Sequence, residues 1–437
     1  MLRFVSLGTV ALLVLLALGA ALAPWLVPDD KETARKVAAA AIFAGSYIAL
    51  AIGKVPGLAI DRTGVALVGA SLMVGCGALP LEDAYKAVDL DTITLLLGMM
   101  IVVANLRLSG FFGLANGWVM RRAHHPLTLL TAVVGVSGVF SAFLVNDAIC
   151  LVLAPLVAEL TLALRRNPVP YLLGVAMASN VGSTATITGN PQNIIIGSVS
   201  GIPYGHFAAM LSPVAAAGLV MTVALLALLY RREFAGKARL EPPARTIRSS
   251  RPLVVRALAG TIAVVALFFA GEPPAKAAIV VAGLLLLNRR IRSSRVYAEI
   301  DWPLLLMFAG LFIIVAGAGQ VLLNQQTIAE VGKFGLDRVP VLSVVTAILS
   351  NLVSNVPAVL VLKPFVTALP DQGRSWLVIA MSSTLAGNFT VLGSIANLIV
   401  VEKAAQRGVQ IGFGAYFRVG APLTVATIVL GTLWLWW

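Results

Sequence analysis

Cysteine, histidine and charged residues are scarce in this chain. Only two cysteines and three histidines occur among 437 residues, and Asp, Glu, Lys and Arg together make up 12%. Cys76 and Cys150 lie within apolar stretches, so neither a disulfide framework nor a thiolate metal cage is expected. The sequence has no G-x-x-x-x-G-K-[ST] phosphate loop, which argues against an ATP-driven pump in one chain but leaves an ATPase partner subunit open. We therefore expect no cofactor and no metal site.

What the chain has instead is hydrophobic residues, which account for 59% of it. The apolar runs are too many and too long for soluble domains, and they indicate an all-α polytopic membrane protein surrounded by lipid. The net charge is +13, but the basic residues cluster in short loops between apolar runs, as at Arg289 to Arg295. Such clusters follow the positive-inside rule, so nucleic acid is not an expected partner.

About eleven transmembrane helices are predicted, and two further apolar segments are too long for a single span. The predicted spans are 4–27, 37–52, 63–80, 92–116, 170–200, 207–230, 253–271, 276–289, 302–323, 376–401 and 415–436. The long segments, 127–163 and 341–369, each contain a polar break, and we interpret both as re-entrant hairpins. The first run has features of a signal peptide, but its length favours a retained helix.

Charge at the mouths of the hairpins predicts that they enter the membrane from opposite faces. The first hairpin has basic residues on both sides, whereas the second is flanked by a mixture of acidic and basic residues. Basic flanks are cytoplasmic, so the first hairpin is expected to enter from inside and the second from outside. The same rule places the amino terminus in the cytoplasm and predicts a multi-pass protein of the cell inner membrane.

One pattern of polar residues occurs twice. SNVGSTATITGNPQN spans residues 179–193, and STLAGNFTVLGSIAN spans residues 383–397, inside equally apolar flanks. Backbone interrupted in this way is tolerated at membrane depth only where it faces protein or a watery cavity. The same order of elements in opposite orientations indicates an inverted repeat, and interrupted segments in corresponding places indicate the binding site of a transporter.

The hairpin tips and helix breaks are expected to converge near the midplane, where they present helix amino termini, free carbonyls, amides and hydroxyls. The predicted substrate-binding residues are Asn146, Ser179, Asn180, Thr184, Thr188, Gly189, Asn190, Asn193, Asn355, Thr384, Asn388, Thr390, Gly393, Ser394 and Asn397. Isolated small polar residues often serve only to pack helices in membranes. Duplicated clusters favour a binding function instead.

Asp147 is the most informative single residue, because an unpaired charged Asp at membrane depth costs about 2.5–3.5 kcal/mol. We expect it to be protonated, paired or ion-coordinating, which makes it the candidate carrier of a proton or cation. Arg107 lies near the cytoplasmic end of a predicted helix, where it either reaches the interface or attracts an anion. A membrane enzyme would need a cluster of His, Cys, Asp and Glu at this depth, so no catalytic residue and no enzyme activity are predicted.

These motifs resemble the ion transporter superfamily, which includes arsenite efflux pumps, NhaD-type sodium/proton antiporters, citrate carriers and divalent-anion/sodium symporters. LVNDAICLVLAPLV (144–157) is similar to the Asn-Asp hairpin motif of arsenite pumps, and TITGNPQN (186–193) to the Gly-x-Pro-x-Asn signature of the superfamily. FTVLGSIANL (389–398) is also similar to an arsenite-pump pattern. The hairpin tips lack the Ser-Asn-Thr of the divalent-anion branch, which argues against a dicarboxylate symporter.

The resemblance implies proton-driven export of arsenite and antimonite by an elevator motion, often in a homodimer. Arsenite is largely a neutral trihydroxy acid at neutral pH, which suits an uncharged site, and two cysteines cannot form a three-thiolate arsenic site. Three alternatives stay open. They are transport of another small inorganic or organic anion, in which Arg107 would matter more, a sodium/proton antiporter, in which Asp147 would ligate Na⁺, and a passive channel.

The resemblance and the repeat together predict five segments of the chain. Scaffold helices are assigned to 1–90 and 253–300, the first repeat to 91–230, a basic cytoplasmic linker to 231–252, and the second repeat to 301–437. The first repeat contains the hairpin 127–163 and the broken helix 170–200. The second contains the hairpin 341–369 and the broken helix 376–401.

Overall fold

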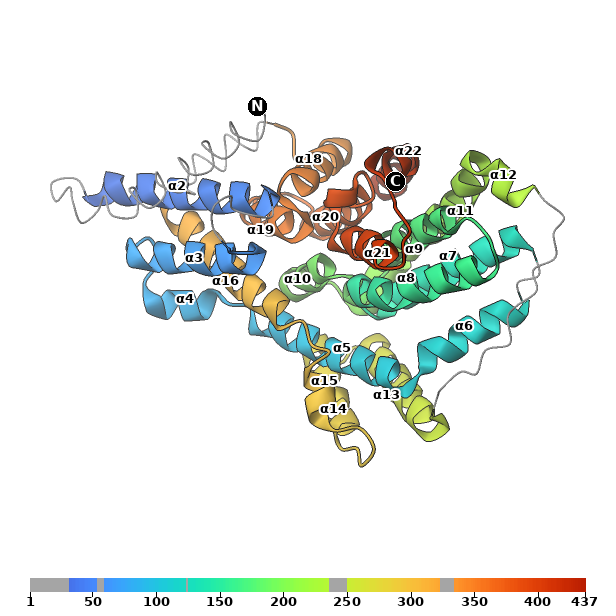
Figure 1. The fold of residues 1–437 in the computed structure, drawn as a ribbon. Helices are drawn as coiled ribbons and strands as arrows, with labels where there is room; N and C mark the ends of the chain where they lie inside the picture. The colour runs from blue at the N-terminus through green and yellow to red at the C-terminus, as the bar shows by residue number, and fades with distance from the viewer. Residues whose placement is uncertain (1–30, 53–58, 123–124, 236–249, 323–333) are drawn as a thin grey trace.

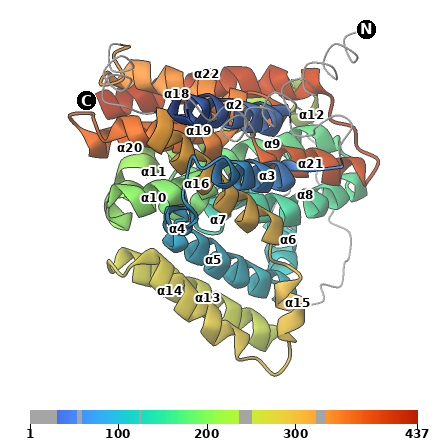
Figure 2. The same cartoon turned by 90° about the vertical axis from the view of Figure 1, so that its left-hand side faces the viewer.

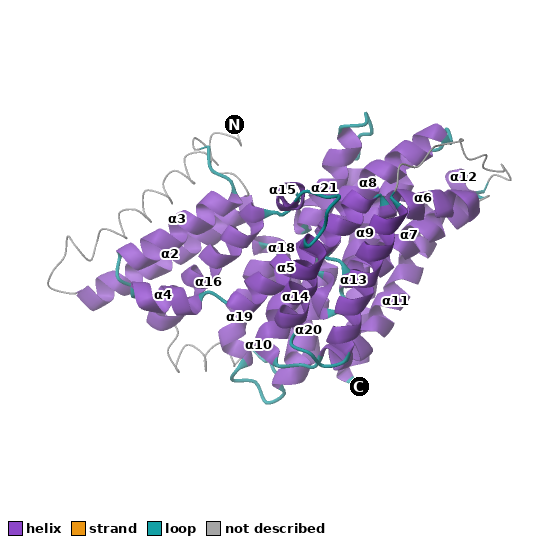
Figure 3. Cartoon of the chain, turned by 90° about the horizontal axis from the view of Figure 1, so that it is seen from below, coloured by secondary structure: helices purple, strands orange, loops and turns teal. Residues whose placement is uncertain are grey.

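The computed structural model describes residues 31–52, 59–122, 125–235, 250–322 and 334–437, and within these ranges it contains helices and loops but no strand (Figure 3). Eight of the described helices are long and apolar enough to cross a membrane. They are α2 (Lys31–Ile52), α5 (Leu90–Ser109), α7 (Pro126–Phe143), α8 (Asn146–Ala163), α11 (Tyr204–Leu229), α13 (Arg251–Phe269), α16 (Trp302–Leu322) and α22 (Phe413–Trp436). The prediction of an all-helical polytopic membrane protein is confirmed.

The eight long helices among the described residues do not test the predicted number of eleven spans, but they show where the predicted spans are interrupted or short. The predicted spans 170–200 and 376–401 are each interrupted, and two others are short helices, namely α3 (Arg62–Gly75) and α14 (Pro274–Leu286). The predicted span 4–27 and most of the predicted linker 231–252 lie outside the described residues. Hydropathy alone counts apolar length, whereas helix length also depends on where polar residues and prolines end each helix.

Both segments interpreted as hairpins are pairs of helices joined at a single break. The first pair is α7 and α8, and the second is α18 (Val339–Val353) and α19 (Asn355–Val366). With 18 residues each, α7 and α8 extend for about 27 Å and are long enough to span, whereas α18 and α19 have 15 and 12 residues. The re-entrant geometry therefore stays a prediction, most of all for the first pair.

The two hairpin tips share an unusual backbone conformation. Val145 and Ser354, each immediately before a tip asparagine, have positive φ angles of 49° and 77°. A β-branched residue such as Val rarely adopts positive φ, and strain of this kind persists only where surrounding contacts hold it. The backbone N–H of Val145 donates to the carbonyl of Thr188 at 3.3 Å, which ties the first tip to the broken helix beside it.

Each predicted broken helix consists of two α-helices separated by a short 3₁₀ turn. The first is α9 (Pro168–Ser183), η2 (Ile187–Gly189) and α10 (Pro191–Ser200), and the second is α20 (Gln372–Ala386), η3 (Val391–Gly393) and α21 (Ile395–Ala405). A long helix, α11 or α22, follows each of them. The order hairpin, broken helix, long helix therefore occurs twice in the described chain.

The helices form two groups that meet around the breaks (Figures 1 and 2). In one group α3 packs against α2 and α16, and α14 packs against α5 and α13. In the other, α7 packs against α9, α18 against α20, and α11 against α9 and α22. The remaining described helices are α4 (Leu81–Ala87), α6 (Phe111–Arg122), α12 (Arg231–Phe234) and α15 (Ser293–Tyr297).

Glycine allows helices within each group to approach closely. A Cβ atom on Gly182 of α9 would lie 2.1 Å from the carbonyl oxygen of Gly138 on α7, and one on Gly98 of α5 would lie 2.8 Å from backbone of Ala278 on α14. Small residues at such crossings are the usual way in which membrane helices gain close van der Waals contact.

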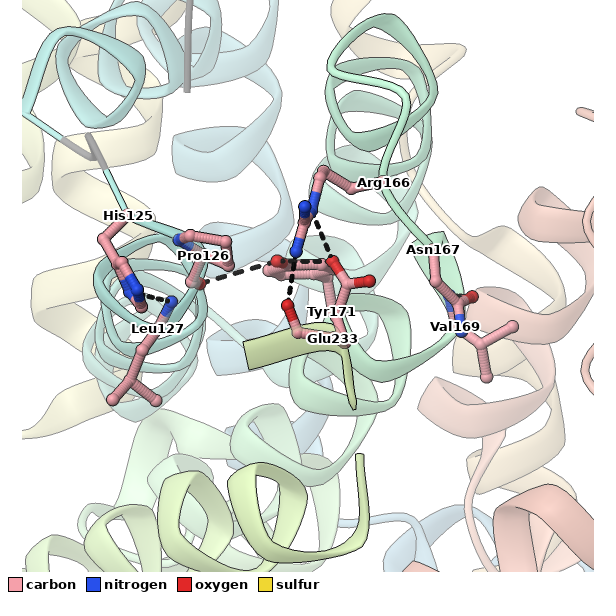
Figure 4. Close-up of polar contacts among 8 residues, drawn as sticks. All are labelled: His125, Pro126, Leu127, Arg166, Asn167, Val169, Tyr171 and Glu233. Carbon is pink, nitrogen blue, oxygen red and sulfur yellow. Dashed lines mark hydrogen bonds and ion pairs between the residues drawn. The ribbon is translucent and has the colours of Figure 1, made fainter. Parts of the chain in front are cut away.

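A charged cluster fastens the ends of several helices in the second group (Figure 4). Arg166 donates through Nε to Glu233 Oε1 at 2.7 Å and also to the Glu233 carbonyl oxygen. The Tyr171 hydroxyl donates to the same carboxylate at 3.2 Å, and its ring packs edge-on against Phe234. This cluster holds the start of α9 against α12, which follows α11.

Candidate functional site

Four helices begin around one cavity of about 40 Å³, which we call the tip cavity. Both hairpins and both broken helices contribute to its lining, which includes Asn146 and Asp147 of α8, Pro191 and Gln192 of α10, Asn355 of α19, and Ser394 and Ile395 at the start of α21. Helix amino termini carry unsatisfied N–H groups and partial positive charge. The tip cavity is therefore suited to oxygen-rich solutes.

Asn180 is at the centre of a buried network that joins the two halves of the chain. Its Oδ1 accepts from Asn146 Nδ2 at 2.9 Å and from Ser394 Oγ at 3.1 Å. Its Nδ2 donates to Asn388 Oδ1 at 2.9 Å and to Asn397 Oδ1 at 3.0 Å. All four hydrogen-bonding positions of this amide are thereby used, so the network fixes its own geometry.

The two helix breaks are closed by the same hydrogen bonds. Asn193 Nδ2 donates to the carbonyls of residues ten and seven positions earlier, which are Ser183 and Thr186. Asn397 Nδ2 donates to carbonyls at the same two separations, which are those of Gly387 and Thr390. The duplicated asparagines therefore satisfy backbone carbonyls that the interruption of each helix leaves free.

Further predicted residues meet across the halves through Thr384. Its Oγ1 accepts from Asn190 Nδ2 at 3.1 Å and from Gln192 Nε2 at 3.1 Å. With its amide nitrogen directed toward the acceptors, Asn355 donates to Gly393 and Ser383 carbonyls, and its oxygen accepts from Gln192, each at 3.2 Å. Gln192 was missed as a site residue, although it lies inside the duplicated pattern.

Some predicted residues support the site without lining the tip cavity. Thr188 shares a hydrogen bond with the Tyr204 hydroxyl at 2.8 Å, and Ser179 accepts from Cys150 at 3.0 Å. Thr184 donates only back to the Asn180 carbonyl. The other members of this set are Gly189, whose Cβ would meet backbone of Ser183, Gly393, whose Cβ would meet backbone of Gly387, and Thr390, whose carbonyl accepts from Asn397.

Asn146 has an unused acceptor at the tip cavity. The residue is 3% exposed, and its Oδ1 has no hydrogen-bond partner within the described part of the chain. A buried carbonyl oxygen without a donor is costly unless a solute or water supplies one. The tip cavity adjoins Asn146, so a hydroxyl group bound there would satisfy this atom.

Asp147 lines two cavities, the tip cavity and a second one of about 90 Å³. We call the second the carboxylate cavity, because Glu299 and Asp301 line it together with Arg107. The Asp147 carboxylate faces the backbone N–H of Ala396, in the first turn of α21, and the carboxylate of Asp301. Among the residues that the structure describes, Asp147 has no ion-pair partner.

Two arginines near the cavities differ in whether they form an ion pair. Arg107, predicted either to reach the interface or to attract an anion, forms an ion pair with Glu299. Arg62, at the start of α3, lines the tip cavity and has no ion pair within the described ranges. Its position was missed because no sequence motif surrounds it; only the packing of α3 against α16 brings it to the hairpin tips.

No group of three or more His, Cys, Asp or Glu side chains that could hold a metal ion occurs within the described ranges. The polar groups at the tip cavity are amides, hydroxyls, one carboxylate and the guanidinium of Arg62. Such groups bind oxyacids through hydrogen bonds and do not resemble a structural transition-metal site.

Comparison with known proteins agrees with this architecture. Residues 47–386 match the CitMHS family, described as citrate transporters. The chain belongs to this family. A 46 kDa membrane protein of Mycobacterium leprae is 31% identical over 92% of this chain and 98% of the relative. The silicon efflux transporter LSI3 of Oryza sativa subsp. japonica is 28% identical over 91% of this chain and 97% of the relative.

The CitMHS fold is also similar to a solved structure. The crystal structure of the Alcanivorax borkumensis YdaH transporter covers 86% of this chain and 88% of that chain, with a TM-score of 0.57 and 16% identity. At that identity the likeness concerns the fold alone. The chain is thus a membrane transporter and not an enzyme, and the predicted relation to the ion transporter superfamily is confirmed at the level of the CitMHS family.

Proposed function

We propose that this CitMHS protein is a secondary active transporter that exports a small uncharged oxyacid, arsenite or antimonite, in exchange for protons. The observation that carries the proposal is the tip cavity, where four helix amino termini meet the unpartnered Oδ1 of Asn146. A neutral trihydroxy acid supplies hydroxyl donors for such an acceptor and oxygen acceptors for the N–H groups. An uncharged solute also avoids the cost of placing an unpaired charge at membrane depth.

The size of the tip cavity supports a small substrate. Its volume is about 40 Å³, and one water needs about 10–15 Å³ by the same measure. The space therefore matches a cluster of a few waters, which is close to the size of arsenious acid. Citrate, with three carboxylate groups, is several times larger. The rice relative is named as a silicon efflux transporter, and silicic acid is likewise a small hydroxy acid.

Asp147 is the proposed proton carrier. It lies one residue from Asn146, so its charge state acts directly on a solute at the tip cavity. A protonated Asp147 leaves the positive charge of Arg62 unbalanced at the tip cavity, whereas an ionised Asp147 offsets that charge and repels anions. Coupling of substrate transport to proton transport requires that the protonated and ionised forms of Asp147 bind substrate with different affinities. Na⁺ in place of H⁺ is the alternative that the test below includes.

The transport cycle is proposed to be alternating access between two groups of helices. The group around α3, α5, α14 and α16 would act as the scaffold, and the hairpins with the broken helices would move as the transport domain. This assignment uses the predicted inverted repeat, the predicted cytoplasmic amino terminus and the cell inner membrane. A homodimer is implied by family likeness alone, and an ATPase partner subunit stays open. Lipid would surround the exposed apolar faces of α13 and α22.

A second candidate substrate is a small organic anion, which one observation favours. The unpaired guanidinium of Arg62 lines the tip cavity, and the family is described as citrate transporters. A carboxylate would pair with Arg62 and with the helix amino termini. This reading requires a conformation in which the tip cavity is larger.

The test is uptake into everted vesicles under an imposed pH gradient, with arsenite, silicic acid, citrate and phosphate offered in turn. We expect arsenite uptake that collapses with the gradient and in Asp147→Asn, but persists in Asp91→Asn. Citrate uptake without arsenite uptake would establish the second candidate. Flux that follows a Na⁺ gradient and ignores the pH gradient would replace the proton with sodium.

A further inference from the structure

Two cavities meet at the Asp147 carboxylate, and they have different chemistry. The tip cavity holds the amide groups of both repeats, whereas the carboxylate cavity is lined by Arg107, Glu299 and Asp301. Asp147 is half-buried, and Asp301 is exposed. The carboxylate cavity therefore connects the half-buried Asp147 with Asp301, which contacts water.

From this arrangement we infer that Asp301 exchanges the coupling proton with Asp147 through the carboxylate cavity, while the substrate reaches Asp147 from the tip cavity. The inference deepens the proposed function, because it names the second residue of the proton path. On release, the O–H bond of the protonated Asp147 carboxyl breaks and a new one forms on a carboxylate oxygen of Asp301, by way of water in the carboxylate cavity that gives up one proton for each it accepts. The negative charge moves the opposite way, and no other reactant is needed.

Asp301 is suited to this role by its fixed position. Its Oδ1 accepts from the backbone N–H of Leu304 at 3.0 Å, which caps the start of α16 and leaves Oδ2 available. The neighbouring start of α3 is tied to the same turn, because Thr63 Oγ1 donates to the Pro303 carbonyl at 3.0 Å. Asp301 and Arg62 therefore stand at adjacent helix ends and approach Asp147 from its two cavities.

The charged and titratable groups around Asp147 favour one shared proton. Asp301 lines the same cavity with like charge, and two carboxylates that share a cavity do not both ionise readily. Arg107 does not neutralise the pair, because Glu299 already engages it. Arg62 faces from the tip cavity, and the Cys150 thiol lies on the same helix as Asp147. The packed helices α9 and α21 contribute the uncharged Asn180 and the Ala396 N–H.

The predicted topology gives the path a direction. Asp301 follows the basic segment Arg289–Arg295, which the positive-inside rule places in the cytoplasm. In this conformation the carboxylate cavity would exchange protons with the cytoplasmic side. An exporter that admits protons from outside must release them on that side.

A test that needs no transported substrate is modification by a hydrophobic carbodiimide, which adds to protonated carboxyl groups. Peptide mass spectrometry on the full-length protein in liposomes would give the labelled fraction of Asp147 as a function of pH. In Asp301→Asn we expect the pH of half-maximal labelling to fall by about one unit, because a neighbouring negative charge is gone. Asn at this position retains the helix cap, so the fold is kept.

The matched control is Asp91→Asn. Asp91 lies in the first turn of a long helix, α5, and it lines a different cavity, together with Lys276. Its substitution should leave the labelling curve of Asp147 unchanged. An unshifted curve in Asp301→Asn, or labelling in the wild type that Na⁺ suppresses and choline does not, would overturn the inference. A shifted curve with no arsenite flux would instead reject the proposed substrate and keep the proton path.

Discussion

Asn180 shows how one side chain can unite two repeats. It contacts Asn146 on one hairpin and Asn388, Ser394 and Asn397 around the other helix break, and it is 1% exposed. Without Asn180, the amide oxygens of Asn388 and Asn397 and the donors of Asn146 and Ser394 would lose these hydrogen bonds. We therefore expect Asn180 to matter both for the stability of the fold and for transport.

We predict that Asn180→Ala lowers both stability and transport. Several amide groups lose their partner, and each unsatisfied buried group costs about 1–3 kcal/mol. Thermal unfolding in detergent and substrate flux in proteoliposomes would measure the two effects. Asn288→Ala is the control, since Asn288 bonds only to the backbone N–H of Arg290 in a loop. Equal stability of the two variants would contradict the role assigned to the network.

Arg62 and Arg107 allow the two candidate substrates to be separated. Arg62→Gln should weaken transport of a carboxylate by roughly tenfold or more, because a charge-assisted hydrogen bond is worth about 1.5–3 kcal/mol. It should change transport of neutral arsenite much less. Arsenite uptake by the wild type and by Arg62→Gln, measured with and without citrate as a competitor, would test both expectations. Arg107→Gln is the matched variant, and a stronger loss of citrate binding there would return the anion role to Arg107.

At the scale of elements, the hairpin tips and the helix breaks are where regular structure stops. Both tips have a residue other than glycine at positive φ, and both breaks are closed by an asparagine that bonds to carbonyls ten and seven residues earlier. These bonds replace the helical ones that the breaks remove. The polar groups at these helix ends are thus held in place at the proposed substrate site.

Because the backbone at the second tip is strained, a substitution by glycine there is predicted to raise the stability of the protein. Ser354→Gly should stabilise the protein by up to about 1 kcal/mol, because glycine adopts positive φ without a steric cost. Ser71→Gly, in the interior of α3, should instead destabilise it by about 0.5–1 kcal/mol. Unfolding temperatures in detergent would compare them. Destabilisation by both substitutions would show that Ser354 is not strained.

The Arg166–Glu233–Tyr171 cluster gives a second prediction at this scale. Its ion pair is mostly buried, with side-chain exposures of 18% and 13%. Glu233→Gln should destabilise the protein by about 1–3 kcal/mol, because Arg166 keeps its charge without a counter-ion. Glu272→Gln breaks the exposed pair with Lys276, at 45% and 68% exposure, and should cost at most a few tenths of a kcal/mol. Similar unfolding temperatures for both variants would refute the difference.

At the scale of the whole molecule, charge in the loops predicts how the chain lies in the membrane. The acidic segment 81–91 is predicted to be outside, and the basic segment 289–299 inside. The native cysteines provide little background for a labelling test, because Cys76 and Cys150 are 3% and 0% exposed.

We expect a cysteine at Glu82 to react with an impermeant maleimide in intact cells, and one at Arg290 to react only in everted vesicles. The extent of labelling on protein gels would report both positions. The reverse pattern would invert the topology, and it would place the carboxylate cavity and its proton path on the outer side.

The sequence alone was sufficient for the all-helical membrane class, for the duplicated pattern at 179–193 and 383–397, and for the position of both polar breaks. These features depend on local composition, because the length of an apolar run and the residues that interrupt it determine helix length within a few turns. The membership in a transporter family also follows from sequence. The interruption of 170–200 was predicted and is observed, whereas the exact number of spans stays a prediction.

Only the tertiary structure decided which polar residues meet. Asn180 reaches Asn388 and Asn397 across more than two hundred residues, and Arg62 and Asp301 come to Asp147 from helices whose sequence has no matching signal. The pairing of Arg107 with Glu299, rather than with a solute, likewise required both partners in space. Contacts of this kind depend on how distant helices pack, which composition and periodicity do not specify.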